Sequence, residues 1–179
     1  MTMAGGSADP TADLIGRLTA EHLTIAVAES LTGGALTAEL TRPAGASAVV
    51  LGGVVVYATE LKRSLVGVDA GLLAEHGPVH PEVARQLARG VRTALAVDGR
   101  AASIGVATTG VAGPDPQSGR SPGTVFVGLS YGDTDEAIEL SLQGTRAQIR
   151  SRSVEAAVQA LVERFLRTDP PRAAVTPSE

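Results

Sequence analysis

The sequence predicts a single α/β domain, a three-layer α/β/α sandwich with a mixed central sheet. Three observations predict this class. Segments with helical spacing alternate with short β-type segments in the first part of the chain. Two strand-like segments then follow one another late in the chain, which favours an antiparallel pair beside parallel strands. Hydrophobic residues make up 44% of the chain but aromatic residues only 2%, so small aliphatic side chains must fill the core.

Apolar residues at helical spacing predict helices over 13–22, 34–41, 60–66, 81–97 and 146–167. The clearest stripe, in 81–97, consists of Val83, Leu87, Val91 and Leu95. The helix over 34–41 should end before Pro43, because the residue before a proline disfavours helical backbone. Apolar runs predict strands over 24–28, 49–57 and 101–108, and a hairpin over 123–129 and 137–142 that turns at 131–133.

The chain of 179 residues suits one domain, and neither a linker nor an internal repeat divides it. We expect the folded unit to run from residue 11 to residue 167. Residues 1–10 are small and polar, and residues 168–179 are rich in proline, alanine and charge. Both ends are therefore expected to be flexible tails.

Composition excludes several classes of function. A net charge of −4, no long basic run and few aromatic residues disfavour nucleic-acid binding. No apolar run approaches the roughly 20 residues that a membrane span needs, and the first ten residues do not form a secretory signal. The absence of cysteine excludes disulfides and thiolate chemistry and fits a cytoplasmic protein. No histidines or carboxylates fall at ligand spacing, so we expect neither a metal nor another cofactor.

A candidate nucleophile lies in residues 29–34, which read Glu-Ser-Leu-Thr-Gly-Gly between a strand and a helix. At such a turn the Ser30 hydroxyl can be exposed at the sheet edge, near the unpaired N–H groups of the helix start. Those N–H groups, around residues 32–34, could hold an oxyanion. The alternative is that Ser30 or Thr32 only caps the helix and that the glycines serve packing.

A serine nucleophile needs a base. Among the three histidines, only His80 is a possible pocket residue, and none has an obvious triad setting. Lys62, which follows the second strand together with Tyr57, is the better base if its amine is neutral. The alternatives are a solvated Lys62 and a Tyr57 at the core edge.

Two further segments could bind an anion. Residues 108–115 and 122–124 form a glycine-spaced loop after a strand, which can present N–H groups to phosphate. Arg146 lies at the start of the last helix, with Arg150 one turn further on, and a guanidinium is a natural fork for phosphate. The alternatives are a structural turn and arginines with no specific partner.

Taken in order, residues 29–34, 53–62, 109–115, 122–125 and 144–146 resemble the C-terminal domain of the competence/damage-inducible protein CinA, over about residues 12–166. Members of that family are known as nicotinamide-nucleotide amidases, which convert nicotinamide mononucleotide to nicotinate mononucleotide and ammonia. The chain resembles the stand-alone form, which lacks the preceding molybdopterin-binding-like domain. The resemblance implies an α/β/α fold, a homodimer, Ser30 as nucleophile and Lys62 as its base.

The chain departs from the family pattern at two places. Thr145 stands where the family often has an acidic residue, and the loop over 115–122 is shorter, with Arg120-Ser121 where a lysine is common. These departures bear on phosphate affinity and substrate identity more than on the nucleophile.

We therefore expect a cofactor-free amidase for nicotinamide mononucleotide, with Ser30 and Lys62 as catalytic residues. The expected substrate-binding residues are Tyr57, Thr32, Gly33, Gly34, Thr109, Gly110, Gly113 and Arg146. Three alternatives stay open from the sequence: a nucleotide-binding regulatory member that turns nothing over, an amidase for another small amide, and a structural or partner-binding protein.

Overall fold

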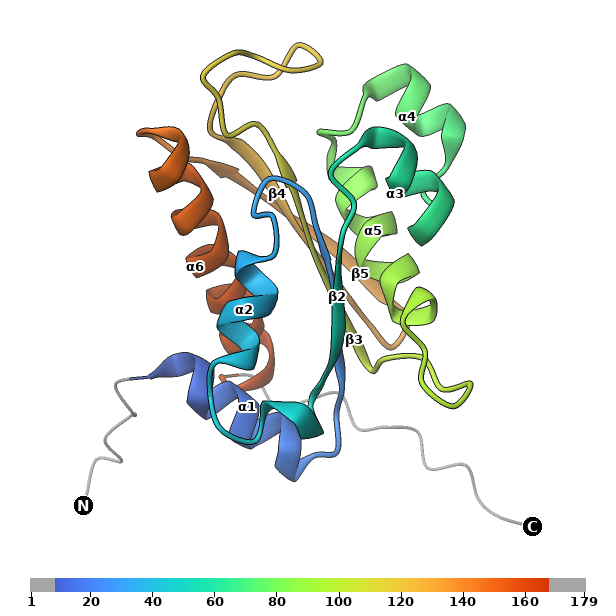
Figure 1. The fold of residues 1–179 in the computed structure, drawn as a ribbon, viewed down its shortest axis with the longest axis vertical. Coiled ribbons are helices and arrows are strands. Elements are labelled where there is room, and N and C mark those ends of the chain that lie inside the picture. Colours follow the sequence, from blue (N-terminus) through green and yellow to red (C-terminus); the bar gives the residue numbers. More distant parts are fainter. Residues whose placement is uncertain (1–8, 168–179) are drawn as a thin grey trace.

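A computed structural model describes residues 9–167 and confirms the expected class, a single α/β domain with a mixed sheet between two helical layers (Figure 1). The sheet has the strand order β2-β1-β3-β4-β5. Its parallel strands are β2 (Val50–Val55), β1 (Ile25–Glu29) and β3 (Ile104–Gly110). The antiparallel strands β4 (Thr124–Tyr131) and β5 (Thr134–Ser141) form the expected hairpin.

Helices cover both faces of this sheet (Figure 1). One layer holds α1 (Pro10–Ala20), α2 (Ala35–Thr41) and the long α6 (Arg146–Phe165). On the other side lie α3 (Thr59–Val66), α4 (Ala70–His76) and α5 (Pro81–Ala94), of which α5 packs directly on the sheet. A short 3-10 helix, η1 (Ala46–Ala48), precedes β2.

The core is divided by the sheet into two clusters. Successive residues of a strand point to opposite faces, and β1 is buried on both. Ile25 and Val27 belong to the cluster that includes residues of α1, α2 and α6, whereas Ala26 and Ala28 belong to the cluster that includes residues of α5. Because β1 is central and fully buried, the residue that follows it emerges between the two helical layers.

Glycine allows α5 to lie close to the sheet. A Cβ atom added at Gly105 in β3 would lie 1.8 Å from the Ala88 carbonyl oxygen, and one added at Gly128 in β4 would lie 2.0 Å from that of Ala84. Any larger residue at either strand position would push the helix off the sheet. The low aromatic content and the small residues thus serve close packing of helix on strand.

Several element boundaries differ from the expectations. The first helix begins at Pro10, where the Asp9 side chain accepts a hydrogen bond from the Ala12 N–H, so the expected tail over residues 1–10 extends too far. The rest of that tail, residues 1–8, and the expected tail over 168–179 lie outside the described residues. The third strand runs from Ile104 to Gly110 rather than over 101–108, and α5 ends at Ala94 rather than at 97.

Helix α4 was not expected. The Asp69 side chain caps it by accepting a hydrogen bond from the Leu72 N–H, but none of its residues is fully buried. A helix without a buried stripe leaves no apolar periodicity in the sequence. Among residues 9–167, no helix combines the length and the apolar character needed to cross a membrane.

Candidate active site

A pocket opens at the carboxyl ends of the parallel strands. The chain leaves β1 towards β2 on one side and later enters β3 on the other side of β1, so the strand order reverses there. In open α/β sheets, ligands bind in the crevice at such a switch point. The pocket, of about 110 Å³, is lined by segments that follow β1, β2 and β3, by Pro78 and Val79 before α5, and by the start of α6.

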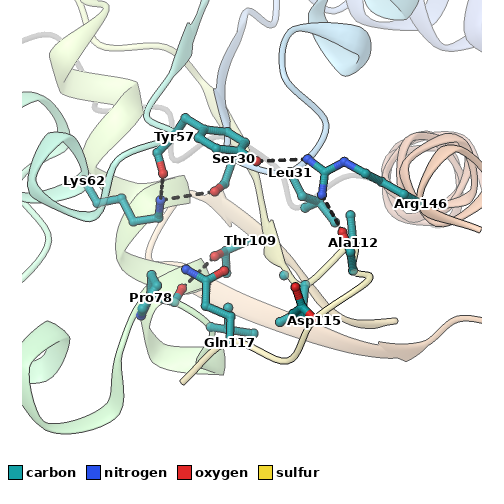
Figure 2. Close-up of a pocket in the computed structure, with 14 residues that line it drawn as sticks. Ser30, Leu31, Tyr57, Lys62, Pro78, Thr109, Ala112, Asp115, Gln117 and Arg146 are labelled. Atoms are coloured by element: carbon teal, nitrogen blue, oxygen red, sulfur yellow. Dashed lines mark hydrogen bonds between the residues drawn. The ribbon is translucent and has the colours of Figure 1, made fainter. Parts of the chain in front are cut away.

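Ser30 and Lys62 meet in this pocket (Figure 2). Ser30 directly follows β1, and Lys62 projects inward from α3. The Lys62 Nζ atom lies 3.1 Å from the Ser30 Oγ atom. Both residues are buried, with 8% of Ser30 and 1% of Lys62 exposed. The predicted pairing of this hydroxyl with this amine is therefore present in the geometry, whereas the alternative of a solvated Lys62 is wrong.

The surroundings of Lys62 favour an uncharged amine. Its Nζ donates hydrogen bonds to the backbone oxygens of Val56, at 2.6 Å, and Tyr57, at 3.4 Å. Together with the Ser30 hydroxyl, these carbonyls are the partners that the described chain provides, so no carboxylate balances a positive charge. Burial lowers the pKa of Lys62 from 10.5 to about 8. A neutral amine can satisfy both carbonyls with its two N–H groups, and its lone pair then faces the hydroxyl.

The helix start behind Ser30 is occupied by the Glu29 carboxylate. Glu29 is fully buried and accepts hydrogen bonds from the backbone N–H groups of Gly34, Leu36 and Thr37, at 2.9, 3.1 and 2.8 Å. The Thr37 hydroxyl adds a fourth, at 2.6 Å. A carboxylate at a helix N-terminus is favoured by the helix dipole and by the unpaired N–H groups there.

The expected oxyanion site at residues 32–34 is therefore wrong in part. The Gly34 N–H donates to Glu29, and the Gly33 N–H donates to the Ser30 carbonyl oxygen at 3.1 Å. The Thr32 hydroxyl pairs with that of Thr108 at 2.8 Å. None of residues 32–34 lines the pocket. In the described chain, the backbone N–H group of Leu31 has no hydrogen-bond acceptor, and because Leu31 lines the pocket, this group is a donor left beside Ser30.

Tyr57 and Arg146 reach toward each other across the pocket (Figure 2). Arg146 Nη2 donates to the Tyr57 hydroxyl at 3.0 Å, and Nη1 donates to the Gly113 carbonyl oxygen at 2.8 Å. Arg146 is the first residue of α6, whose capping box pairs Thr145 with Gln148. Thr145, which replaces an acidic residue of the family pattern, thus serves as the helix cap that presents Arg146.

The remaining expected residues have mixed outcomes. Thr109 and Gly110 line the pocket, but from the end of β3 rather than from a loop, and the Thr109 hydroxyl donates to the Pro78 carbonyl oxygen at 2.6 Å. His80 does not line it, because its ring caps α5 through Nδ1 and stacks on His76. Arg150, which the sequence left open as a second fork for an anion, does not line the pocket and donates to two backbone carbonyls.

Sequence reasoning missed part of the lining. The residues not expected there are Leu31, Pro78, Val79 and Gln117, whereas Val111, Ala112 and Asp115 belong to the segment over 108–115 that was expected to face an anion, although none was named as a binding residue. Asp115 ends the segment over 109–115 that carries the family resemblance, and this was the available signal for it. The others are apolar or lie in loops without a pattern. Within the described residues, no group of three or more histidine or acidic side chains is arranged to hold a metal ion.

The fold and this pocket together define a class: three-layer α/β proteins with a buried serine–lysine pair at the topological switch point. Residues 8–165 match the model of the CinA C-terminal domain, and the chain belongs to that family. It is 45% identical over 163 residues to a CinA-like protein of Frankia casuarinae and 41% identical over 155 residues to a putative competence-damage inducible protein of Halalkalibacterium halodurans. These matches cover 90% and 86% of the chain but only 36% of each relative, so the chain spans about a third of their length.

Solved structures of CinA-family proteins have a similar fold. A CinA superfamily protein from Klebsiella pneumoniae superposes with a TM-score of 0.82 at 29% identity, covering 89% of this chain and 97% of that one. The competence/damage inducible protein CihA from Agrobacterium tumefaciens superposes with a TM-score of 0.74 at 30% identity, covering 90% and 98% of the two chains. Both agree with the fold described here.

Proposed function

We propose that this pocket is the active site of an amidohydrolase that converts nicotinamide mononucleotide to nicotinate mononucleotide and ammonia. The observation that carries the proposal is the contact of the buried Lys62 amine with the Ser30 hydroxyl, at 3.1 Å. A hydroxyl paired with a basic amine is an activated nucleophile. The resemblance of residues 29–34 and 109–115 to the nicotinamide-nucleotide amidases suggests the substrate.

The first half of the reaction forms an ester. Neutral Lys62 takes the proton of Ser30 as Oγ attacks the carboxamide carbon, and the carbonyl oxygen becomes an oxyanion. The N–H group of Leu31, which lines the pocket, is a donor available to that oxyanion. Lys62, now an ammonium, returns the proton to the nitrogen as the C–N bond breaks, and ammonia leaves.

The second half releases the acid. Lys62 is neutral again and takes a proton from a water molecule that attacks the ester carbon. The bond between this carbon and Oγ breaks, the proton passes from Lys62 to Oγ, and nicotinate mononucleotide departs. Ser30 and Lys62 return to their starting states, so the cycle consumes one water and one amide and needs no cofactor.

The charges at the pocket support a zwitterionic ligand. Nicotinamide mononucleotide carries a cationic pyridinium ring and an anionic phosphate. Arg146 supplies a guanidinium to the lining and Asp115 a carboxylate. In the proposed complex the phosphate lies at Arg146 and displaces its contacts with Tyr57 and Gly113, since a charge-assisted bidentate contact is stronger than those to a neutral hydroxyl and carbonyl.

The test is ammonia release from nicotinamide mononucleotide by the wild type and by Ser30→Ala, with a chelator control. The Ser64→Ala variant is a matched control, because this serine lies exposed on α3 and donates only to the Glu60 carbonyl oxygen. We expect Ser30→Ala to lose activity and Ser64→Ala to keep it. Full activity of Ser30→Ala would end the serine mechanism, and a rise in melting temperature with the ligand but without ammonia would indicate a binding protein instead.

We also propose that the chain forms a homodimer through the edge of the sheet at β2. This strand has no charged residue, and Val55 at its end is 44% exposed. Leu61 and Leu65 of the following helix α3 are 37% and 53% exposed and lie one turn apart on the same helix face. An unpaired apolar edge strand is a ready template for pairing with another chain.

A further inference from the structure

Arg150 lies on α6 one turn after Arg146, but its guanidinium serves a different part of the molecule. Its Nε donates to the Leu31 carbonyl oxygen at 2.9 Å, and its Nη2 donates to the Thr32 carbonyl oxygen at 3.0 Å. The two N–H groups of one planar fork thus hold two successive peptide units, 119 and 118 positions away in the sequence. These are the two residues that directly follow Ser30.

This contact reaches Ser30 through one peptide unit. The carbonyl of Thr32 and the N–H of Gly33 belong to the same trans peptide and point in opposite directions. The carbonyl accepts from Arg150, and the N–H donates to the Ser30 carbonyl oxygen at 3.1 Å. Two hydrogen bonds in series therefore connect the guanidinium to the backbone of the nucleophile. Such chains polarise one another and strengthen each bond.

The same geometry orients a second peptide unit. Because the Leu31 carbonyl points at Arg150, the Thr32 N–H points away from α6. This N–H has no acceptor in the described chain, although Thr32 itself does not line the pocket. Arg150 thus fixes both the turn that carries the hydroxyl and the direction of a neighbouring donor.

We propose that Arg150 is a positioning residue for the nucleophile turn, which it holds so that Ser30 Oγ meets Lys62. The inference deepens the proposed function and rests on Ser30 being the reacting group. A lysine cannot replace it fully, because an ammonium is a single point and lacks the rigid pair of donors. The turn favours glycine at position 33, because its φ of 60° lies in the left-handed region.

The surroundings of Arg150 make the proposal testable by chemical rescue. Its side chain also lines a wide groove of about 880 Å³ between α1, α2 and α6. Truncation to alanine would therefore leave a space that opens to solvent. A guanidinium ion from solution can enter that space and offer the same planar donors to the two carbonyls, at concentrations far below those that unfold proteins.

The experiment uses two assays. The first measures the rate at which a fluorophosphonate labels Ser30, by intact-protein mass spectrometry, and the second measures ammonia release from nicotinamide mononucleotide. The variants are Arg150→Ala, Arg150→Lys and the matched control Arg152→Ala, whose arginine lies on the same helix and donates to the Gln143 carbonyl oxygen. For Arg150→Ala we expect labelling and kcat to fall about tenfold or more, with KM unchanged. Millimolar guanidinium should restore both in part, whereas Arg152→Ala should match the wild type.

The labelling assay tests the role of Arg150 independently of the proposed substrate. If the wild type is labelled but releases no ammonia, the proposed substrate fails and the comparison of labelling rates still tests Arg150. Labelling of Arg150→Ala within twofold of the wild type would overturn the inference. So would a slow variant that guanidinium leaves slow, because that loss is general damage to the fold. If Arg150→Ala does not fold by circular dichroism, Arg150→Lys takes its place and should show an intermediate labelling rate; a wild-type rate would overturn the inference.

Discussion

Ser30 and Lys62 lie 32 positions apart, yet the hydroxyl of one contacts the amine of the other in a site where both are almost inaccessible to water. Each residue follows a parallel strand, and the carboxyl ends of parallel strands meet at one edge of the sheet. This relationship gives the site its dependence on pH. The amine can accept a proton only when it is uncharged, and burial is what favours the uncharged form.

We expect kcat/KM to rise with pH through the pKa of Lys62, which burial lowers to about 8. The neutral fraction of a base with this pKa increases about tenfold from pH 7 to pH 9, and the rate should follow it. Ammonia release across this range, at a substrate concentration well below KM, measures the effect. A profile that is already flat at pH 7 would contradict a lysine base with a pKa of about 8. Lys62→Met should lose activity at every pH.

The same pKa predicts a change in stability. The pKa of Lys62 is about 8 in the folded chain and 10.5 in the unfolded chain. At a pH between these two values, the unfolded chain therefore binds one proton more than the folded chain. The free energy of unfolding should therefore rise with pH in this window, by about 1.4 kcal/mol per pH unit and about 3 kcal/mol in total. Urea unfolding of the wild type minus that of Lys62→Met isolates this contribution. If the difference does not change from pH 7 to pH 10.5, burial does not shift this amine.

Glu29 also supports the turn, through the start of α2, and its loss should be costly. In Glu29→Gln, an amide group with only one accepting oxygen replaces a carboxylate that accepts four hydrogen bonds. We expect the free energy of unfolding to fall by about 2–3 kcal/mol, because buried N–H groups lose their acceptor. Urea unfolding measures it. The control is Glu75→Gln, an exposed carboxylate on α4, which should change stability by less than about 0.5 kcal/mol. Equal stabilities of the two variants would refute this role of Glu29.

The sequence predicted the contact of Ser30 with Lys62 but not the residues that support it, for a physical reason. Ser30 directly follows a strand and Lys62 lies near the start of the helix after the next strand, and such junctions can be recognised from local patterns. Glu29 also stands there, but nothing local shows that its side chain turns back to take the N–H groups of α2. Arg150 depends on a contact across 119 positions, and only the packing of α6 beside α2 brings it to the turn.

The fold was predictable to a similar degree. The strand hairpin and the stripe of α5 were recognised because their apolar residues repeat at regular intervals. The sequence predicts a loop at Thr109 and Gly110 because a threonine and a glycine carry little apolar signal, but pairing with Phe126 and Val125 makes them the end of β3. Whether a segment forms a strand depends on the strand it pairs with as much as on its own residues, so its own sequence does not decide it.

Arg146 should control substrate affinity more than turnover. It lies at the pocket with its guanidinium held by Tyr57 and Gly113, away from the Ser30–Lys62 contact. Arg146→Ala removes a charge-assisted contact to the proposed phosphate, so KM for nicotinamide mononucleotide should rise about tenfold or more while kcat changes little. Tyr57→Phe removes only the partner hydroxyl and should have a smaller effect. Steady-state kinetics of ammonia release check both. A fall in kcat with unchanged KM for Arg146→Ala would place this arginine in the chemical step instead.

The proposed dimer makes a prediction about α3. Leu65 is 53% exposed on the helix that follows the edge strand β2, so Leu65→Glu places a charge in the proposed interface. Burying an unpaired charge is costly enough to dissociate a dimer of ordinary size. Light scattering coupled to size-exclusion chromatography should give the mass of two chains for the wild type and of one chain for the variant. Val97, 48% exposed beyond the end of α5, provides the matched control, and Val97→Glu should stay dimeric. A monomeric wild type would exclude the dimer, and a dimeric Leu65→Glu would place its interface away from α3.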